Sequence, residues 1–313
     1  MTRALPLLLL ATLAAAGDPD PAWLLMTARD GSVWVREDGK EVRRAGPAAA
    51  PRGDAALSPD GEAWLVARNQ RGNGGVFLLP VEGGEMRRLI RETDGARWPS
   101  WCADGVRFVY AAPAGGTWQL FRASVADEPV RGERLTKEEG DVLHACTSPD
   151  GQRVAYVVRT PTQRRSKLPH GDVVMLELAT GKRTVLAEGV APLELSWSPG
   201  GGHLAVSTAS SLDLFDPATG ERARRIVPSD IHADLYAHGA HDLCWRPDGK
   251  VLACRITFLG GRAAAADGTF EAILGDHELF FLPLEGNPAW IELPKDVHRG
   301  PFRWGAPPAG KTR

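Results

Sequence analysis

Short apolar stretches alternate with turn residues along most of the chain, and this alternation is typical of β-hairpins. The stretch Arg153–Val157, for example, directly follows the turn Ser148–Gly151. Proline fixes φ, aspartate hydrogen-bonds its own backbone and glycine adopts positive φ, so each Pro-Asp-Gly turn joins two antiparallel strands. A second hairpin follows, here Val173–Leu178 and Arg183–Leu186 on either side of Gly181. Each such period therefore predicts four strands.

The turn recurs along the chain in five copies that are not identical. Its glycines lie 44, 46, 50 and 48 residues apart, and they are Gly61, Gly105, Gly151, Gly201 and Gly249. The second hairpin occurs six times, the first time at Val33–Arg44, where the preceding strand Trp23–Met26 has no partner upstream. Phe302–Trp304 is a candidate for that partner. Because radially repeated four-stranded units form propellers, we predict an all-β fold, a six-bladed β-propeller of four-stranded blades whose first blade is closed by the C-terminal strand.

These repeats resemble the WD40-like repeat of bacterial exported propellers, the TolB type. The resemblance is carried by a tryptophan or apolar residue before Ser-Pro-Asp-Gly, followed by an apolar strand, and it covers Trp23 to Trp304. It implies the propeller fold but not a particular function, because folds of this kind host many functions. The additional N-terminal domain of TolB itself is not expected, because the six predicted blades use the chain.

The first residues predict a secretory signal rather than a part of the fold. Arg3 is followed by the apolar run Leu5–Leu13 and by Ala14–Ala16, which is a charged, apolar and small-residue order typical of a cleaved signal. The run is too short to span a bilayer. We therefore expect a signal peptide at 1–16, the propeller at 17–306 and a disordered tail at 307–313, and we expect the protein to be periplasmic or secreted with no transmembrane segment.

The composition excludes some partners and leaves the cysteines open. The chain has 37 Lys and Arg against 39 Asp and Glu, a formal charge of −2. This near-balance offers no excess positive field for a phosphate backbone, so we expect no nucleic acid. Four cysteines allow two disulfides, with Cys244 and Cys254 across one turn and Cys102 and Cys146 remaining, but buried free thiols are an equal alternative.

The connections opposite the Pro-Asp-Gly turns are long and irregular, and we expect the functional face there. Rigid scaffolds usually carry binding residues on such loops, although plain surface insertions also cost little. The four long connections are Asn69–Gly75, Arg159–Gly171, Ser229–Asp242 and Leu259–Asp276.

We expect three groups of binding residues on this face. Trp98 and Trp118 border the loops and suit a partner contact. Cations on one loop suit an acidic partner or a polysaccharide, unless they are simply solvated: Arg164, Arg165 and Lys167. Residues before the innermost strands should surround the central mouth, for polar recognition or for salt bridges within the ring: Asp54, Arg97, His144, Glu194 and Asp242.

One loop is rich in histidine and raises the alternative of an enzyme. His232, His238 and His241 lie within ten residues, together with Asp230 and Asp234. Imidazole and carboxylate suit a divalent metal, but no ligand spacing of a known site matches. Hydrolase and metalloprotease motifs are missing from the sequence.

Our leading hypothesis is a non-catalytic, monomeric binding module of the bacterial envelope with a protein or glycan partner and no cofactor. The alternative is a metal-dependent enzyme that cleaves polysaccharides with the histidine loop.

Overall fold

The computed structural model describes the strands and most of the turns of the chain. The described residues are 23–28, 31–35, 41–45, 54–68, 73–81, 84–91, 95–159, 170–208, 210–227, 236–264, 270–274, 278–285, 289–292 and 303–305. Among them, residues 23–45, 236–239, 257–278, 289–292 and 303–305 are described by their backbone alone. The predicted signal peptide and the predicted tail lie outside the described residues, so both stay predictions.

Three antiparallel sheets follow one another between Ala55 and Val190, each with four strands in hairpin order. The first contains β4 (Ala55–Leu57), β5 (Ala63–Arg68), β6 (Gly75–Pro80) and β7 (Arg87–Arg91). The second contains β8 (Arg97–Trp101), β9 (Arg107–Ala114), β10 (Thr117–Ser124) and β11 (Glu133–Arg134). The third contains β12 (Asp141–Thr147), β13 (Arg153–Arg159), β14 (Gly171–Glu177) and β15 (Arg183–Val190).

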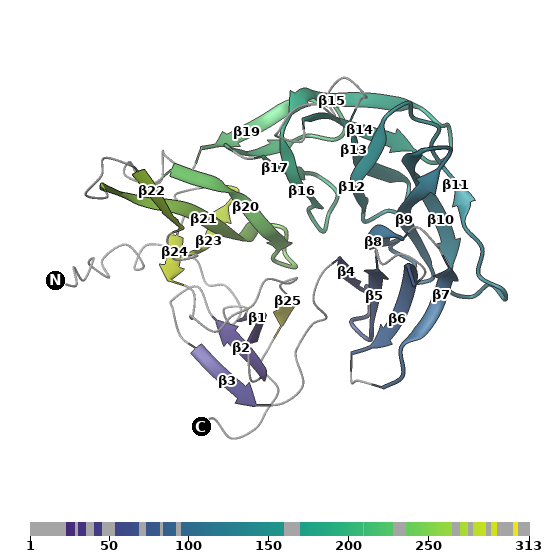
Figure 1. Ribbon diagram of the computed structural model, residues 1–313, viewed down its shortest axis with the longest axis horizontal. Helices are drawn as coiled ribbons and strands as arrows, with labels where there is room; N and C mark the ends of the chain where they lie inside the picture. The colour runs from purple at the N-terminus through teal and green to yellow at the C-terminus, as the bar shows by residue number, and fades with distance from the viewer. Residues whose placement is uncertain are drawn as a thin grey trace.

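Two further sheets continue the series. One contains β16 (Pro192–Trp197), β17 (Leu204–Thr208), β18 (Leu212–Phe215) and β19 (Arg222–Ile226). The other contains β20 (Tyr236–Trp245), β21 (Val251–Ala264), β23 (Glu278–Pro283) and β24 (Ala289–Glu292), with β22 (Phe270–Leu274) paired to β21. The sheets are arranged around a ring, with β4, β8, β12, β16 and β20 nearest its centre (Figure 1). This arrangement is a β-propeller.

The two ends of the described chain meet in a separate four-stranded sheet. It contains β1 (Trp23–Ala28), β2 (Gly31–Val35), β3 (Glu41–Ala45) and β25 (Arg303–Gly305) in the order β25-β1-β2-β3. β25 runs antiparallel to β1, with Trp304 opposite Leu24. This sheet is described by its backbone alone.

The prediction of six equivalent four-stranded blades is wrong. Five blades are built on the five copies of the turn, and described side-chain packing joins these five. The terminal sheet contains no copy of the turn, so the sequence pattern that identified the other blades does not extend to it.

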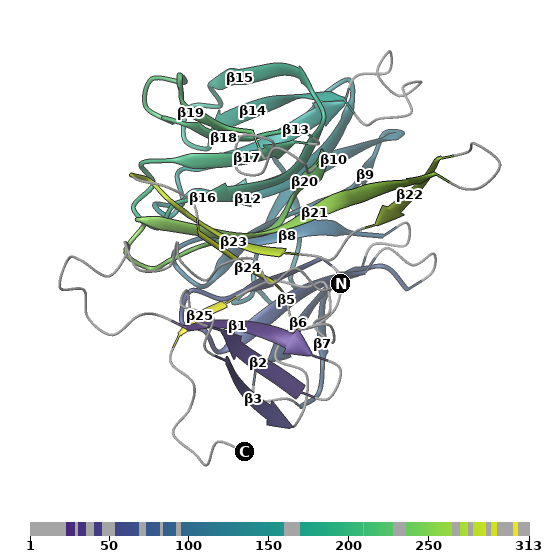
Figure 2. The ribbon, with the colours of Figure 1, turned by 90° about the vertical axis from the view of Figure 1, so that its left-hand side faces the viewer.

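The last of the five blades departs from the prediction in a second way, because it has five strands. β21 runs on past its pairing with β23, which ends at Ile256, and its extension pairs with β22 (Figure 2). The expected irregular connection from Leu259 to Asp276 is therefore largely a hairpin, and β20 begins at Tyr236, inside the other connection expected at Ser229–Asp242.

The Pro-Asp-Gly turns owe their shape to local hydrogen bonds. Ser148 Oγ accepts the Arg153 N–H at 2.9 Å, and Asp150 Oδ1 accepts the Gln152 N–H at 3.0 Å. Gly151 has a φ of 67°, which is costly for other residues. The same bonds recur at Ser58 and Asp60. The sequence motif therefore specifies the turn directly.

Neighbouring turns also pack on one another. A Cβ at Gly105 would lie 3.9 Å from Pro59 Cδ, and a Cβ at Gly201 would lie 3.8 Å from Pro149 Cδ. Gly249 approaches Pro199 in the same way. On the face that carries these turns, called the lower face below, three of the turn glycines thus lie beside the proline of the preceding turn.

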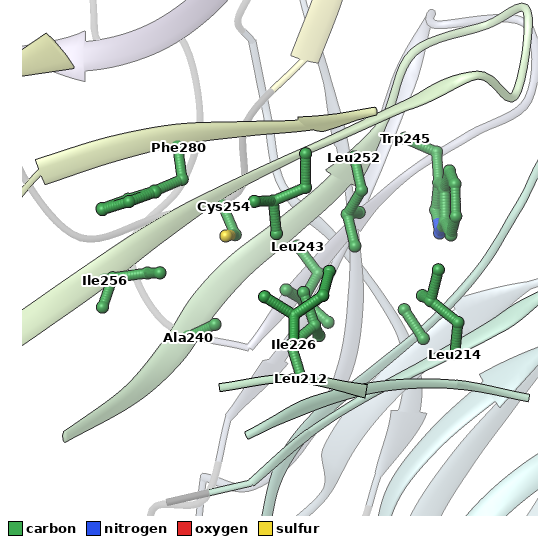
Figure 3. Close-up of a cluster of buried hydrophobic side chains, with 12 residues drawn as sticks. Leu212, Leu214, Ile226, Ala240, Leu243, Trp245, Leu252, Cys254, Ile256 and Phe280 are labelled. Atoms are coloured by element: carbon green, nitrogen blue, oxygen red, sulfur yellow. The ribbon is translucent and has the colours of Figure 1, made fainter. Parts of the chain in front are cut away.

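Apolar side chains fill the spaces between adjacent blades. Figure 3 shows one of these clusters, in which Leu214 and Ile226 face Trp245, Leu252 and Phe280 of the next blade. The tryptophans that precede three of the turns lie in such interfaces. Their indole N–H groups donate to the preceding blade at 3.2 Å in three places: Trp101 to Ala56 O, Trp197 to Cys146 O and Trp245 to Ser196 O.

None of the four cysteines, all of which lie in the described part of the chain, forms a disulfide. Cys244 lies opposite Ala253 across β20 and β21, so Cys254 points to the other side of the sheet. Cys254 is fully buried in the cluster of Figure 3, and Cys102 is also buried. The alternative of buried free thiols thus agrees with this structure.

Candidate binding site at the inner rim

Five residues occupy the same place in the five blades, four positions before the first residue of the turn. We call them the inner rim residues, and they are Asp54, Trp98, His144, Glu194 and Asp242. In four of the blades the pairing of the innermost strand is irregular at this place. A bulge of this kind bends the strand and redirects a side chain. The irregular strand pairing at the rim is therefore a recurring feature of the repeat.

Three of the inner rim residues have a backbone conformation that side chains rarely adopt. The φ angles are 48° at Trp98, 49° at His144 and 56° at Asp242, and no other non-glycine residue described by the structure has a positive φ. Each costs about 1–3 kcal/mol, because Cβ crowds the backbone. Strain of this kind collects at functional sites. The rim is therefore the best candidate for one in the described part of the chain.

Hydrogen bonds connect two rim residues of adjacent blades. The Glu194 carboxylate accepts the backbone N–H of Asp242 at 2.7 Å and that of Leu243 at 3.0 Å. The Glu194 carboxylate thus holds the strained bulge of the blade that follows it.

Aromatic rings and a cation gather beside the second and third of the five blades. The Trp98 ring centroid lies 6.2 Å from that of Trp118 and 5.0 Å from that of His144. The Arg97 guanidinium carbon lies 5.3 Å from the centroid of the Trp98 ring and 6.0 Å from that of Trp118. Both tryptophans are half-buried, so each residue keeps some exposed surface.

Trp118 is held in place through its backbone. Its N–H donates to Asp141 Oδ1 at 3.1 Å, and Asp141 Oδ2 lies 3.5 Å from Arg159 Nη2. The backbone of Trp118 is therefore fixed by the Asp141 carboxylate, which is paired with Arg159.

Burial perturbs the ionisable groups of the rim. Desolvation, with a smaller contribution from the Asp242 charge, raises the pKa of Glu194 to about 8. Desolvation, together with the positive charges of Arg97 and His241, lowers the pKa of His144 to about 4. Desolvation also raises the pKa of Asp54, although Arg97 opposes this. Several perturbed groups in one place mark a candidate functional site.

One buried cation supports the carboxylates. Arg255 is 1% exposed, and its Nε lies 3.1 Å from Asp242 Oδ2. An arginine at this depth is stable only when it is paired. Asp242 is thus held between the Glu194 carboxylate, which binds its N–H, and the Arg255 guanidinium.

The depressed pKa of His144 predicts an acid sensitivity. The unfolded chain binds a proton at the ordinary pKa of 6.5, whereas the folded chain does so only near 4. Stability should therefore fall by roughly 2–3 kcal/mol as the pH drops through this range, over and above the other groups. Urea unfolding of His144→Asn, whose side chain tolerates positive φ, should show a smaller fall. If the free energy of unfolding falls equally with decreasing pH in the two proteins, this prediction is contradicted.

The structure brings some of the predicted site residues together and leaves others untested. Trp98, Trp118, Arg97 and His144 form one cluster, and Glu194 and Asp242 form the other. Arg164, Arg165, Lys167 and His232 lie outside the described residues, as does the side chain of His238. A binding role for any of these residues stays a prediction.

Sequence reasoning missed two parts of the site. The strain at Trp98, His144 and Asp242 has no local signal, because no glycine marks it. Arg255 had a signal, since it is the single charged residue in the apolar stretch Val251–Leu259. A lone charge in such a stretch indicates a buried partner.

The residues that the structure describes do not test the predicted metal site. His241 lies in β20 opposite Arg255, where a cation is already present. In the described part of the chain, no three or more His, Cys, Asp or Glu side chains are grouped as metal ligands. Two of the three candidate histidines lie outside the described side chains, so the metal stays a prediction. Across the described residues there is also no helix suited to crossing a membrane.

Comparison with known proteins points to one family. The family model described as "TolB beta propeller domain" matches residues 22–214. No curated protein sequence matches the chain.

Three solved structures have a similar fold. A putative TolB from Agrobacterium tumefaciens is 17% identical at a TM-score of 0.50, over 66% of this chain and 78% of that one. TolB from Acinetobacter baumannii is 16% identical at a TM-score of 0.51, over 86% of this chain and 65% of that one. A chain of a nidogen/laminin complex is 12% identical at a TM-score of 0.53, over 80% and 91%. At these identities the likeness concerns the fold alone.

Proposed function

Because the chain belongs to the TolB beta propeller domain family, we propose that it is a non-catalytic binding module of the bacterial envelope, whose inner rim receives a segment of a protein partner. A propeller is a scaffold for such interactions, since its rigid ring carries residues that need little ordering when a partner binds. The fold alone does not specify the class of partner or the binding site, so both are part of the proposal.

One observation carries the proposal: the strained backbone positions at Trp98, His144 and Asp242 recur at one place in three blades. Such conformations cost stability, and they collect at functional sites, which supports a role of these positions in binding. Their common effect is to direct side chains to the inner rim, where Trp98 and Trp118 lie beside Arg97.

The side chains of this cluster fit a protein partner. Tryptophan and arginine are the residues that contribute most at protein interfaces, especially when they are already fixed. Here both tryptophans contact one another, the backbone of Trp118 is fixed by Asp141, and both residues are half-buried rather than fully buried. Mixed charges nearby, including Asp54 and Arg97, favour polar recognition of a peptide backbone and its side chains over a purely apolar contact.

Envelope location is part of the proposal. The charged, apolar and small-residue order of residues 1–16 supports export. Protein recovered from the periplasm or the medium should then begin at Gly17. Recovery from the cytosol with residues 1–16 attached would contradict this part.

The test of the proposed site uses peptides selected from a displayed library on the immobilised full chain, with dissociation constants measured by calorimetry. Trp118→Ala should weaken binding of the selected peptides by about tenfold or more, because it removes a fixed aromatic contact. The control is Val106→Ser on the lower face, where Val106 is 40% exposed. This variant should bind as the unmodified protein does.

Two results would contradict the proposal. Peptides that bind Trp118→Ala and the unmodified protein equally would place recognition elsewhere. Soluble oligosaccharides that bind with Trp118-dependent affinity, in a protein that selects no peptide, would make the partner a glycan.

A further inference from the structure

Two arginines of the first of the five blades lie over the same phenylalanine ring, and neither forms an ion pair within the described part of the chain. The Arg68 guanidinium carbon lies 5.0 Å from the centroid of the Phe77 ring, and the Arg88 guanidinium carbon lies 5.4 Å from it. We infer that these two arginines form a binding site for an oxyanion, a phosphate or a carboxylate group, separate from the inner rim. This inference goes beyond the proposed function and does not depend on it.

The pairing of β5, β6 and β7 brings the three side chains together. Phe77 lies opposite Arg88 on one side and opposite Val66 on the other. Arg68 is two positions further along β5 than Val66, so it is on the same face of the sheet as Phe77. That face carries the buried cluster of Trp64, Val66 and Phe77, whereas the opposite face packs on the second blade. Both cations therefore share one face of the first blade.

Arg88 is fixed by groups that carry no charge. Its Nη1 donates to Asn73 Oδ1 at 3.4 Å, and its Nη2 donates to the backbone carbonyl of Gly74. Its Nε is buried and has no hydrogen-bond partner among the atoms that the structure describes. A charged donor that is buried without an acceptor costs stability, and a bound anion would offset this cost.

Arg68 keeps most of its hydrogen-bond donors available. Its Nη2 donates to Met86 Sδ at 3.8 Å, and a thioether is only a weak acceptor. The residue is half-buried, so it keeps some exposed surface. A guanidinium is a planar fork of donors that matches carboxylate and phosphate oxygens. Arg68 can therefore bind an oxyanion directly, while Arg88 supplies a fixed positive charge close by.

The fourth blade has a carboxylate at the equivalent place. Asp213 and Phe77 each lie seven residues before the glycine of their outer hairpin. Asp213 is opposite Arg225 in the strand pairing, as Phe77 is opposite Arg88. The Asp213 carboxylate accepts Arg225 at 2.8 Å and 3.0 Å and lies 3.8 Å from Arg222. The first blade thus has two arginines but a phenylalanine instead of the acid, and a bound oxyanion would supply the negative charge.

The charge of the site favours an anion with two negative charges. Two cations near one ring repel each other, and the repulsion is stronger at a partly buried place than in water. The ring attracts each cation, but less than a carboxylate does. Inorganic phosphate and glutarate both carry up to two charges, so they are suitable probes for the two kinds of group.

The experiment titrates the full chain with inorganic phosphate and, separately, with glutarate, by calorimetry at low ionic strength. We expect at least one probe to bind with a dissociation constant of about 1 mM or tighter. Arg68→Met keeps the apolar contact with Phe77 and should weaken this binding by about tenfold or more, because hydrogen bonds to a charged group are lost. Arg88→Met should have a similar effect in protein that thermal melting shows to be folded.

The matched control is Arg122→Met. It also removes one arginine, but one that is already paired with Glu133 at 2.7 Å. This variant should bind the probe as the unmodified protein does, because it leaves the site on the first blade intact. An equal loss in Arg122→Met and Arg68→Met would overturn the inference, since binding would then depend on overall charge alone.

The two probes distinguish the source of the oxyanion. Binding of phosphate alone that Arg68→Met loses would support the site and make the ligand a phosphate group, whereas the same result with glutarate alone would make it a carboxylate. An unmodified protein that binds neither probe would overturn the inference. So would an Arg68→Met protein that binds as tightly as the unmodified one. Trp118→Ala should bind the probe normally, because the inner rim is a separate site.

Discussion

Replacement of Arg255 by methionine should lower the free energy of unfolding by about 3–5 kcal/mol, because it leaves the Asp242 carboxylate buried without its cation. Arg255 is 1% exposed, and the two groups are 3.1 Å apart. Glu194 lies close by and would add repulsion when it is ionised. Methionine fills a similar volume, so the lost charge rather than a cavity dominates the effect. Urea unfolding at neutral pH measures it.

The second substitution Asp242→Asn separates the charge from the packing. Asparagine tolerates the positive φ at this position and carries no charge. The double variant should therefore recover a large part of the stability that Arg255→Met loses. If the double variant is less stable than Arg255→Met alone, the ion pair does not explain the cost.

The second large effect is expected at the interface between the last two of the five blades. Trp245→Ala should cost about 3–5 kcal/mol, since it opens a cavity in the cluster of Figure 3 and removes an indole hydrogen bond. Trp245 is 7% exposed, and its Nε1–H donates to Ser196 O at 3.2 Å. Unfolding in urea again measures the loss.

Trp245→Phe separates the contribution of the indole hydrogen bond from that of the apolar packing. Phenylalanine keeps most of the apolar contact with Leu252 and Leu214, which surround Trp245 in Figure 3, but it cannot reach Ser196 O. We expect it to cost about 1–2 kcal/mol, for one buried carbonyl left unpaired and a smaller ring. A phenylalanine variant as unstable as the alanine variant would show that the hydrogen bond, and not the packing, holds these blades together.

The turn motif explains how much of the fold could be predicted from sequence. Ser, Pro, Asp and Gly each act on their own backbone, so a copy such as Ser148–Gly151 specifies a hairpin wherever it stands. The similar spacing of the copies, 44 to 50 residues, then predicts blades. β22 was missed because it pairs with the far end of β21, where no turn motif is present and the stretch reads as a loop.

The candidate site was predictable only in part, for a related reason. Position relative to the turn identified Asp54, His144, Glu194 and Asp242, because a repeat places equivalent residues at equivalent points of the ring. Which of them hold one another could not be predicted, since those bonds run from side chain to backbone across blades. The positive φ of Trp98 could not be predicted either, because propensity alone argues against it.

The glycine-on-proline contacts of the lower face limit where the chain tolerates extra residues. The four later turns each contact the turn before them, as Gly201 contacts Pro149 and Gly249 contacts Pro199. A residue inserted into one turn would therefore displace its successor as well, and the disturbance would pass from blade to blade. Epitope tags and fused domains belong instead in the connections on the opposite face, such as the one between β13 and β14.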